Sequence, residues 1–82
     1  MSQGEKRFEQ MRRNPKGDWR IEDVKLVCRW AGVECCPPSS GSHYGVAHSS
    51  QNDILTIPAD RPIKTVYIKK LVQFIDQVRS ET

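Results

Sequence analysis

The sequence predicts an α+β domain with the order helix, three strands, helix, preceded by a further helix at the N-terminus. Two segments, 20–31 and 65–79, carry apolar residues at helical spacing. Three short segments between them, 33–36, 43–48 and 53–58, have the length of strands and are bounded by Gly, Pro, Ser and Asn residues. The chain has 82 residues, which suits one small domain rather than two.

The first predicted helix covers residues 5–13. Phe8 and Met11 lie three residues apart and therefore share a face, with basic residues around them. Pro15 and Gly17 end the helix, because proline restricts the residue before it and glycine favours a turn. We therefore divide the chain into an N-terminal extension, residues 1–13, and a main domain, residues 14–82.

The second predicted helix covers residues 20–31. Asp18 is the expected N-cap, and Glu22 and Asp23 fall in the first turn, where the helix dipole favours negative charge. Gly32 is expected to end the helix. Its apolar face consists of Ile21, Val24, Val27, Cys28 and Ala31.

The strands and the final helix complete the predicted domain. Residues 37–42 begin with two prolines, which cannot donate to a ladder, so this segment is a connector. The short spacing of the last two strands predicts an antiparallel hairpin. Because each element must bury an apolar face, the two main helices are expected on one face of a three-stranded antiparallel sheet. The final helix, 65–79, has the apolar stripe Ile68, Leu71, Val72, Ile75 and Val78.

Composition sets broad limits on function. The 13 Lys and Arg residues exceed the 10 Asp and Glu residues, a formal charge of +3, which permits phosphate contact without demanding it. No apolar run approaches the roughly 20 residues that span a bilayer, and the N-terminus lacks the apolar core of a signal peptide. The odd number of cysteines does not indicate a secreted disulfide scaffold. We expect a cytoplasmic protein with no membrane contact.

Two motifs resemble those of the HicA toxin family. They are Gly-Ser-His-Tyr-Gly-Val at 41–46 and Leu-Thr-Ile-Pro at 55–58, followed by a basic loop and an amphipathic helix. The resemblance covers residues 14–79. It implies a double-stranded-RNA-binding-domain-like fold, cleavage of messenger RNA, and a HicB-type antitoxin that binds the toxin and masks its site. It also identifies His43 as the active-site histidine and Gly41 as the family's glycine.

The chemistry of RNA cleavage suits these residues. RNA carries its own nucleophile, the 2′-OH, and histidine is a natural general acid and base because imidazole titrates near neutral pH. His43 is therefore the expected catalytic residue, Gly41 allows a close backbone approach, and Ser42 can donate a hydrogen bond to phosphate. The sequence has no cluster of carboxylates that would indicate a required metal ion, so we expect no cofactor. The basic residues expected to bind the RNA backbone are Arg29, Arg61, Lys64 and Lys69.

Two alternatives remain open at this stage. The connector before Gly41 lacks the basic residue that HicA members often carry, which favours a non-catalytic RNA-binding or partner-binding domain. His43 would then be an ordinary surface histidine. A zinc site is the second alternative, but the two adjacent cysteines do not have the usual C-x₂-C spacing and the histidines fall on opposite strand faces. Its ligands would be Cys35, Cys36, His43 and His48.

Overall fold

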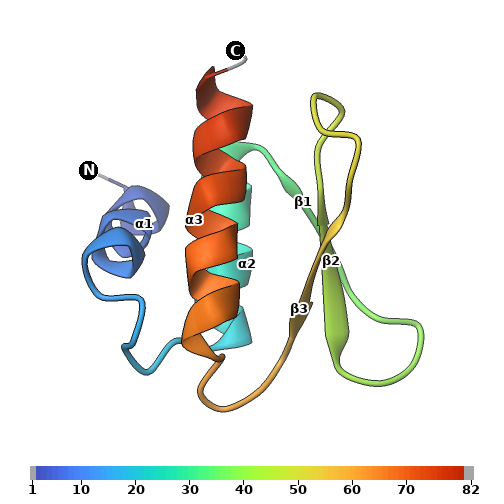
Figure 1. Cartoon of the computed structure of the whole chain (residues 1–82), viewed down its shortest axis with the longest axis horizontal. Coiled ribbons are helices and arrows are strands. Elements are labelled where there is room, and N and C mark those ends of the chain that lie inside the picture. The colour runs from blue at the N-terminus through green and yellow to red at the C-terminus, as the bar shows by residue number, and fades with distance from the viewer. Residues whose placement is uncertain (1, 81–82) are drawn as a thin grey trace.

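The computed structural model describes residues 2–80, and this part of the chain confirms the α+β class and the predicted element order (Figure 1). Met1, Glu81 and Thr82, which belong to the predicted extension and main domain, lie outside the described residues. The elements are α1 (Gln3–Arg13), α2 (Ile21–Ala31), β1 (Glu34–Cys36), β2 (His43–Ala47), β3 (Leu55–Pro58) and α3 (Thr65–Ser80).

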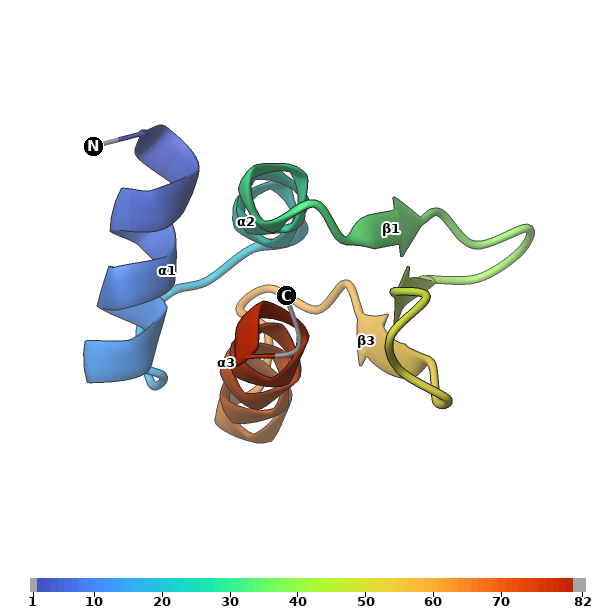
Figure 2. The same cartoon turned by 90° about the horizontal axis from the view of Figure 1, so that it is seen from above.

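The strands form one antiparallel sheet in the order β1-β2-β3. Cys36 pairs with Gly45 across the first ladder, and His43 pairs with Pro58 across the second. Figure 2 shows three layers: the sheet, then α2 and α3 side by side, then α1 on the far side of these helices. The prediction that the two main helices cover one face of an antiparallel sheet is confirmed, and no helix or strand of residues 2–80 covers the other face, which we call the open face.

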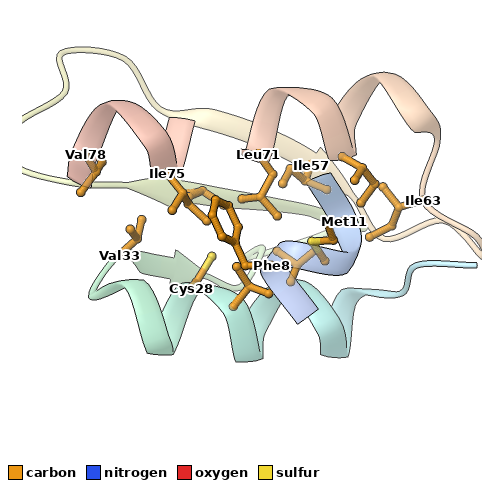
Figure 3. Close-up of a cluster of buried hydrophobic side chains, with 13 residues drawn as sticks. Phe8, Met11, Cys28, Val33, Ile57, Ile63, Leu71, Ile75 and Val78 are labelled. Atoms are coloured by element: carbon orange, nitrogen blue, oxygen red, sulfur yellow. The ribbon is translucent and has the colours of Figure 1, made fainter. Parts of the chain in front are cut away.

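The hydrophobic core is built from residues of the sheet and of all three helices (Figure 3). The predicted stripe of α3 is confirmed, since four of its five residues are buried and Val72 is half-buried. Three residues of the α2 face, Val24, Val27 and Cys28, are buried as well. Ile63, in the loop before α3, is only 2% exposed although it lies outside every helix and strand.

The N-terminal helix α1 packs into the same core as the main domain. Phe8 and Met11 are buried, and the Phe8 ring lies 5.4 Å from the Trp30 ring of α2. The Arg12 guanidinium donates to both carboxylate oxygens of Asp76 on α3, at 2.8 and 2.5 Å, which raises the pKa of Arg12. An ion pair between Arg7 and Asp23 adds a second polar contact, this one to α2. The predicted extension is therefore a structural layer of this fold.

Gly4 marks the closest approach of α1 to α2. A Cβ at this position would lie 2.3 Å from the Trp30 Cβ and 3.0 Å from the Leu26 carbonyl oxygen. We expect Gly4→Ala to lower the free energy of unfolding by about 1–2 kcal/mol, because an overpacking cost of about 1–3 kcal/mol outweighs the gain in helix propensity of about 0.5–1 kcal/mol. Urea denaturation measures this change. Gln10→Ala, at an exposed position of α1, is the control, and a Gly4→Ala protein as stable as the control would contradict the packing argument.

The predicted N-cap of the second helix, Asp18, is wrong. The N-cap residue is Arg20, whose backbone N–H donates to the Asp23 carboxylate at 3.0 Å. Because the helix begins at Ile21, Asp18 lies two residues before the N-cap position, and Asp23 in the first turn accepts the Arg20 N–H from inside the helix. The Asp18 carboxylate instead contacts the Arg20 guanidinium at 3.4 Å.

The second and third strands are shorter than predicted at the two ends that are joined by the hairpin turn. β2 ends at Ala47 and β3 begins at Leu55. The difference arises from a turn, in which the Gln51 N–H donates to the His48 carbonyl at 3.0 Å and the Ser50 N–H donates to His48 Nδ1 at 3.1 Å. His48 therefore lies just beyond the strand.

Candidate functional site

His43 is the first residue of β2 and lies on the open face of the sheet. Successive strand residues point to opposite faces. Val46 is buried, and the Tyr44 ring lies 5.2 Å from Lys25 Nζ of α2, so these two strand residues face the helices. His43 therefore points the other way, and it is exposed. Its imidazole forms no hydrogen bond or ion pair within residues 2–80.

The two residues before His43 form an accessible approach to it. Gly41 has a φ of 82°, in the left-handed region that favours glycine, and a Cβ there would meet nothing within 4 Å. The Ser42 carbonyl accepts a hydrogen bond from the Ala59 N–H at 2.8 Å, which continues the ladder past the His43–Pro58 pair. The backbone at 42–43 is thus fixed, whereas the space beside Gly41 is open.

Two of the predicted phosphate ligands, Arg61 and Lys64, lie in the loop between β3 and α3. Arg61 lies two residues after Ala59, which is bonded to Ser42, and Lys64 lies immediately before α3. Both side chains are exposed. The loop is held by buried Ile63, whose N–H donates to the Trp19 carbonyl at 2.8 Å, and it contains a cis peptide bond before Pro62. In Figure 1 this loop and the β1–β2 connector both lie at the lower end of the molecule.

The other two predicted phosphate ligands lie elsewhere. Lys69 is on α3 beside Met11 and Arg12 of α1, and α1 lies on the opposite side of the helices from the sheet (Figure 2). Arg29 is near the C-terminal end of α2, the upper end in Figure 1. Of these four cations, only Arg61 and Lys64 belong to the loop that leaves the end of the sheet where His43 lies.

An apolar side chain shares the open face with His43. Ile54, just before β3, is 67% exposed, and its Cγ2 lies 3.3 Å from where a Cβ at Gly45 would be. Gly45 thus leaves room for Ile54 to lie against the middle strand. The resulting surface combines an imidazole, an isoleucine and exposed backbone.

Sequence reasoning did not single out Lys25 or the contact between two cysteines. Lys25, Cys28 and Arg29 share one face of α2 through their three- and four-residue spacing, and they line a surface pocket together with Cys35 of β1. The helical spacing was visible in the sequence. The pairing of this face with Cys35 was not visible, because it depends on how β1 docks on α2.

The residues of the zinc alternative are separated by the sheet. Cys35 packs against the core, whereas Cys36, the next residue, points to the open face with His43. His48 Nδ1 is in hydrogen-bond contact with Ser50 Oγ at 2.8 Å. Among the residues that the structure describes, no group of three His, Cys, Asp or Glu side chains is arranged to hold a metal ion.

Two further observations concern the whole of the described chain. None of the helices within residues 2–80 is long and apolar enough to cross a bilayer. Comparison of the sequence and structure with protein-family models, with curated proteins and with solved structures found no match. The candidate site is thus defined by its own residues: exposed His43, the open approach at Gly41 and Ser42, and the cations Arg61 and Lys64.

Proposed function

We propose that this chain is a HicA-type toxin, a metal-independent endoribonuclease that cleaves messenger RNA and has a double-stranded-RNA-binding-domain-like fold. The observation that carries the proposal is the position of His43. Its imidazole is exposed on the open face of the sheet, without an intramolecular partner in residues 2–80, directly after a positive-φ glycine with free space around it. An RNA backbone can approach such a histidine without displacing other side chains.

In the proposed reaction His43 acts as the general base and acid. Neutral imidazole takes the proton of the ribose 2′-OH, whose oxygen then bonds to the adjacent phosphorus. The bond between phosphorus and the 5′ oxygen breaks, and this oxygen receives a proton from the imidazolium or from water. The products are a 2′,3′-cyclic phosphate and a 5′-hydroxyl end. Arg61 and Lys64 stabilise the charge on the phosphoryl oxygens, and the Ser42 hydroxyl is a further donor.

The different positions of these cations predict that Arg61 and Lys64 contribute to RNA binding and that Lys69 does not. We expect Arg61→Ala and Lys64→Ala each to weaken RNA binding severalfold and to reduce the slope of log K against log salt by roughly one, as expected for the loss of one phosphate contact. Lys69→Ala is the matched control, because Lys69 is also exposed but lies beside α1. Fluorescence anisotropy with single-stranded RNA at several salt concentrations measures both quantities. Equal losses for Lys64→Ala and Lys69→Ala would contradict this prediction.

The proposed partner is a HicB-type antitoxin that covers this site, and the proposed place of action is the cytoplasm. Ile54, which is 67% exposed on the same face as His43, would contact a partner that covers this site. A toxin of this class inhibits growth when expressed alone and is neutralised when its antitoxin is expressed with it. Growth with and without the partner gene tests this part of the proposal.

The second candidate is a non-catalytic RNA-binding or partner-binding domain with the same fold. The connector at 37–40 favours it, because Pro-Pro-Ser-Ser supplies no cation next to the site. Incubation of purified protein with long single-stranded RNA in EDTA separates the two candidates. Accumulation of fragments with cyclic phosphate ends supports the ribonuclease, and RNA that is bound but remains intact supports the binding domain.

A further inference from the structure

A pair of cysteine thiols lies between α2 and β1, apart from the proposed RNA site. Cys28 is 1% exposed and Cys35 is half-buried, and both line a surface pocket of about 260 Å³. The two thiols lie close enough to shift each other's pKa in opposite directions. Lys25 and Arg29 of α2 line the same pocket, which places two positively charged side chains around the thiols.

We propose that Cys35 is a thiol-modification site that reacts with hydrogen peroxide and is then linked to Cys28 by a disulfide bond. In the first step the Cys35 thiolate attacks one peroxide oxygen, the O–O bond breaks, and Cys35 becomes a sulfenic acid as hydroxide leaves. In the second step the Cys28 sulfur attacks the Cys35 sulfur. The S–O bond breaks, the Cys28 proton and the leaving hydroxyl form water, and the S–S bond joins α2 to β1.

The surroundings of Cys35 favour its thiolate form. Interaction with the Cys28 thiol and the positive charge of Lys25 lower the pKa of Cys35 to about 7, against the opposing effect of partial burial. The same interaction and burial raise the pKa of Cys28, which stays protonated. The titratable and charged groups that line the pocket with Cys35 are Lys25, Cys28 and Arg29 of α2. On β2 the partner of Cys35 in register is the apolar Val46, and Tyr44 on the same face contacts Lys25.

Strand alternation distinguishes Cys28 from Cys36 as the partner of Cys35. Cys36 is adjacent in sequence but exposed on the open face, whereas Cys35 points toward α2. A disulfide within the chain should therefore join 28 to 35. Exposed Cys36 is instead the thiol best placed to link two chains.

Peptide mapping tests this assignment on the full chain. Cleavage after Lys and Arg places Cys28 in peptide 26–29 and both remaining cysteines in peptide 30–64. After treatment with hydrogen peroxide we expect these two peptides to be linked by a disulfide within monomers of both the wild type and Cys36→Ser. Cys35→Ser should lack the link. A link that persists in Cys35→Ser, or wild-type protein that forms only chain-to-chain disulfides through Cys36, would overturn the proposal.

Alkylation kinetics provide a second test that does not depend on disulfide formation. In the Cys36→Ser protein, the rate of Cys35 alkylation by iodoacetamide should rise through a midpoint near pH 7. Cys28→Ala in the same background removes the neighbouring thiol, so the midpoint should move to higher pH and the rate at pH 7 should fall by roughly tenfold. Circular dichroism confirms that each variant is folded. An unchanged midpoint in folded Cys28→Ala would overturn the role given to Cys28.

Discussion

Replacing His43 with alanine is expected to lower the rate of RNA cleavage by about 10²–10⁴-fold, the range typical for the loss of a general acid–base group. The same change should leave the free energy of unfolding within about 0.5 kcal/mol of the wild-type value, as for other surface substitutions. The structural reason is that the imidazole is exposed and forms no hydrogen bond or ion pair within residues 2–80. Initial rates with a labelled RNA in EDTA and urea denaturation of the same preparations measure both effects.

His48→Ala is the matched control for this experiment. His48 follows β2 directly, and its ring contacts Ser50 within the turn. It lies toward the end of β2 opposite to the end that starts at His43. We expect His48→Ala to retain cleavage close to the wild-type rate. Undiminished cleavage by folded His43→Ala would exclude His43 as the catalytic residue, and equal losses in both variants would show that the assay reports something other than this site.

Much of the fold could be predicted because its elements carry separate local signals. The stripe from Ile68 to Val78 has helical spacing, and Pro37 and Pro38 interrupt the chain between two strands. The N-cap of α2 could not be located from composition alone. Asp18 is a typical capping residue, but the N-cap is Arg20 because the helix begins at Ile21, and composition does not fix that boundary.

The proposed site was only partly predictable, and the reason is geometric. Sequence spacing identified exposed cations but not the side of the molecule on which each lies. Lys64 and Lys69 are five residues apart, yet one lies in the loop between β3 and α3 and the other beside α1. This separation exists because α1 covers the outer side of α3, and the docking of α1 depends on contacts between distant residues such as Arg12 and Asp76.

Leu71→Ala is expected to lower the free energy of unfolding by about 2–5 kcal/mol, the usual cost of such a cavity in a packed core. Leu71 of α3 is 0% exposed and belongs to the same buried cluster as Ile57 of the sheet and Met11 of α1 (Figure 3). All three layers of the fold therefore meet around it. Urea denaturation measures the change, and Val66→Ala is the control because Val66 is an apolar residue of the same helix that is 50% exposed.

The size of the domain makes this loss severe. Stabilities of about 0.05–0.15 kcal/mol per residue give roughly 4–12 kcal/mol for 82 residues, so one cavity at Leu71 removes a large part of the total. We therefore expect Leu71→Ala to unfold at much lower urea concentration than the wild type, and to lose any RNA cleavage where it unfolds. Val66→Ala should change the midpoint little. If both variants unfolded at the wild-type midpoint, Leu71 could not lie in the shared core, and the packing of α3 against the sheet and α1 would have to be revised.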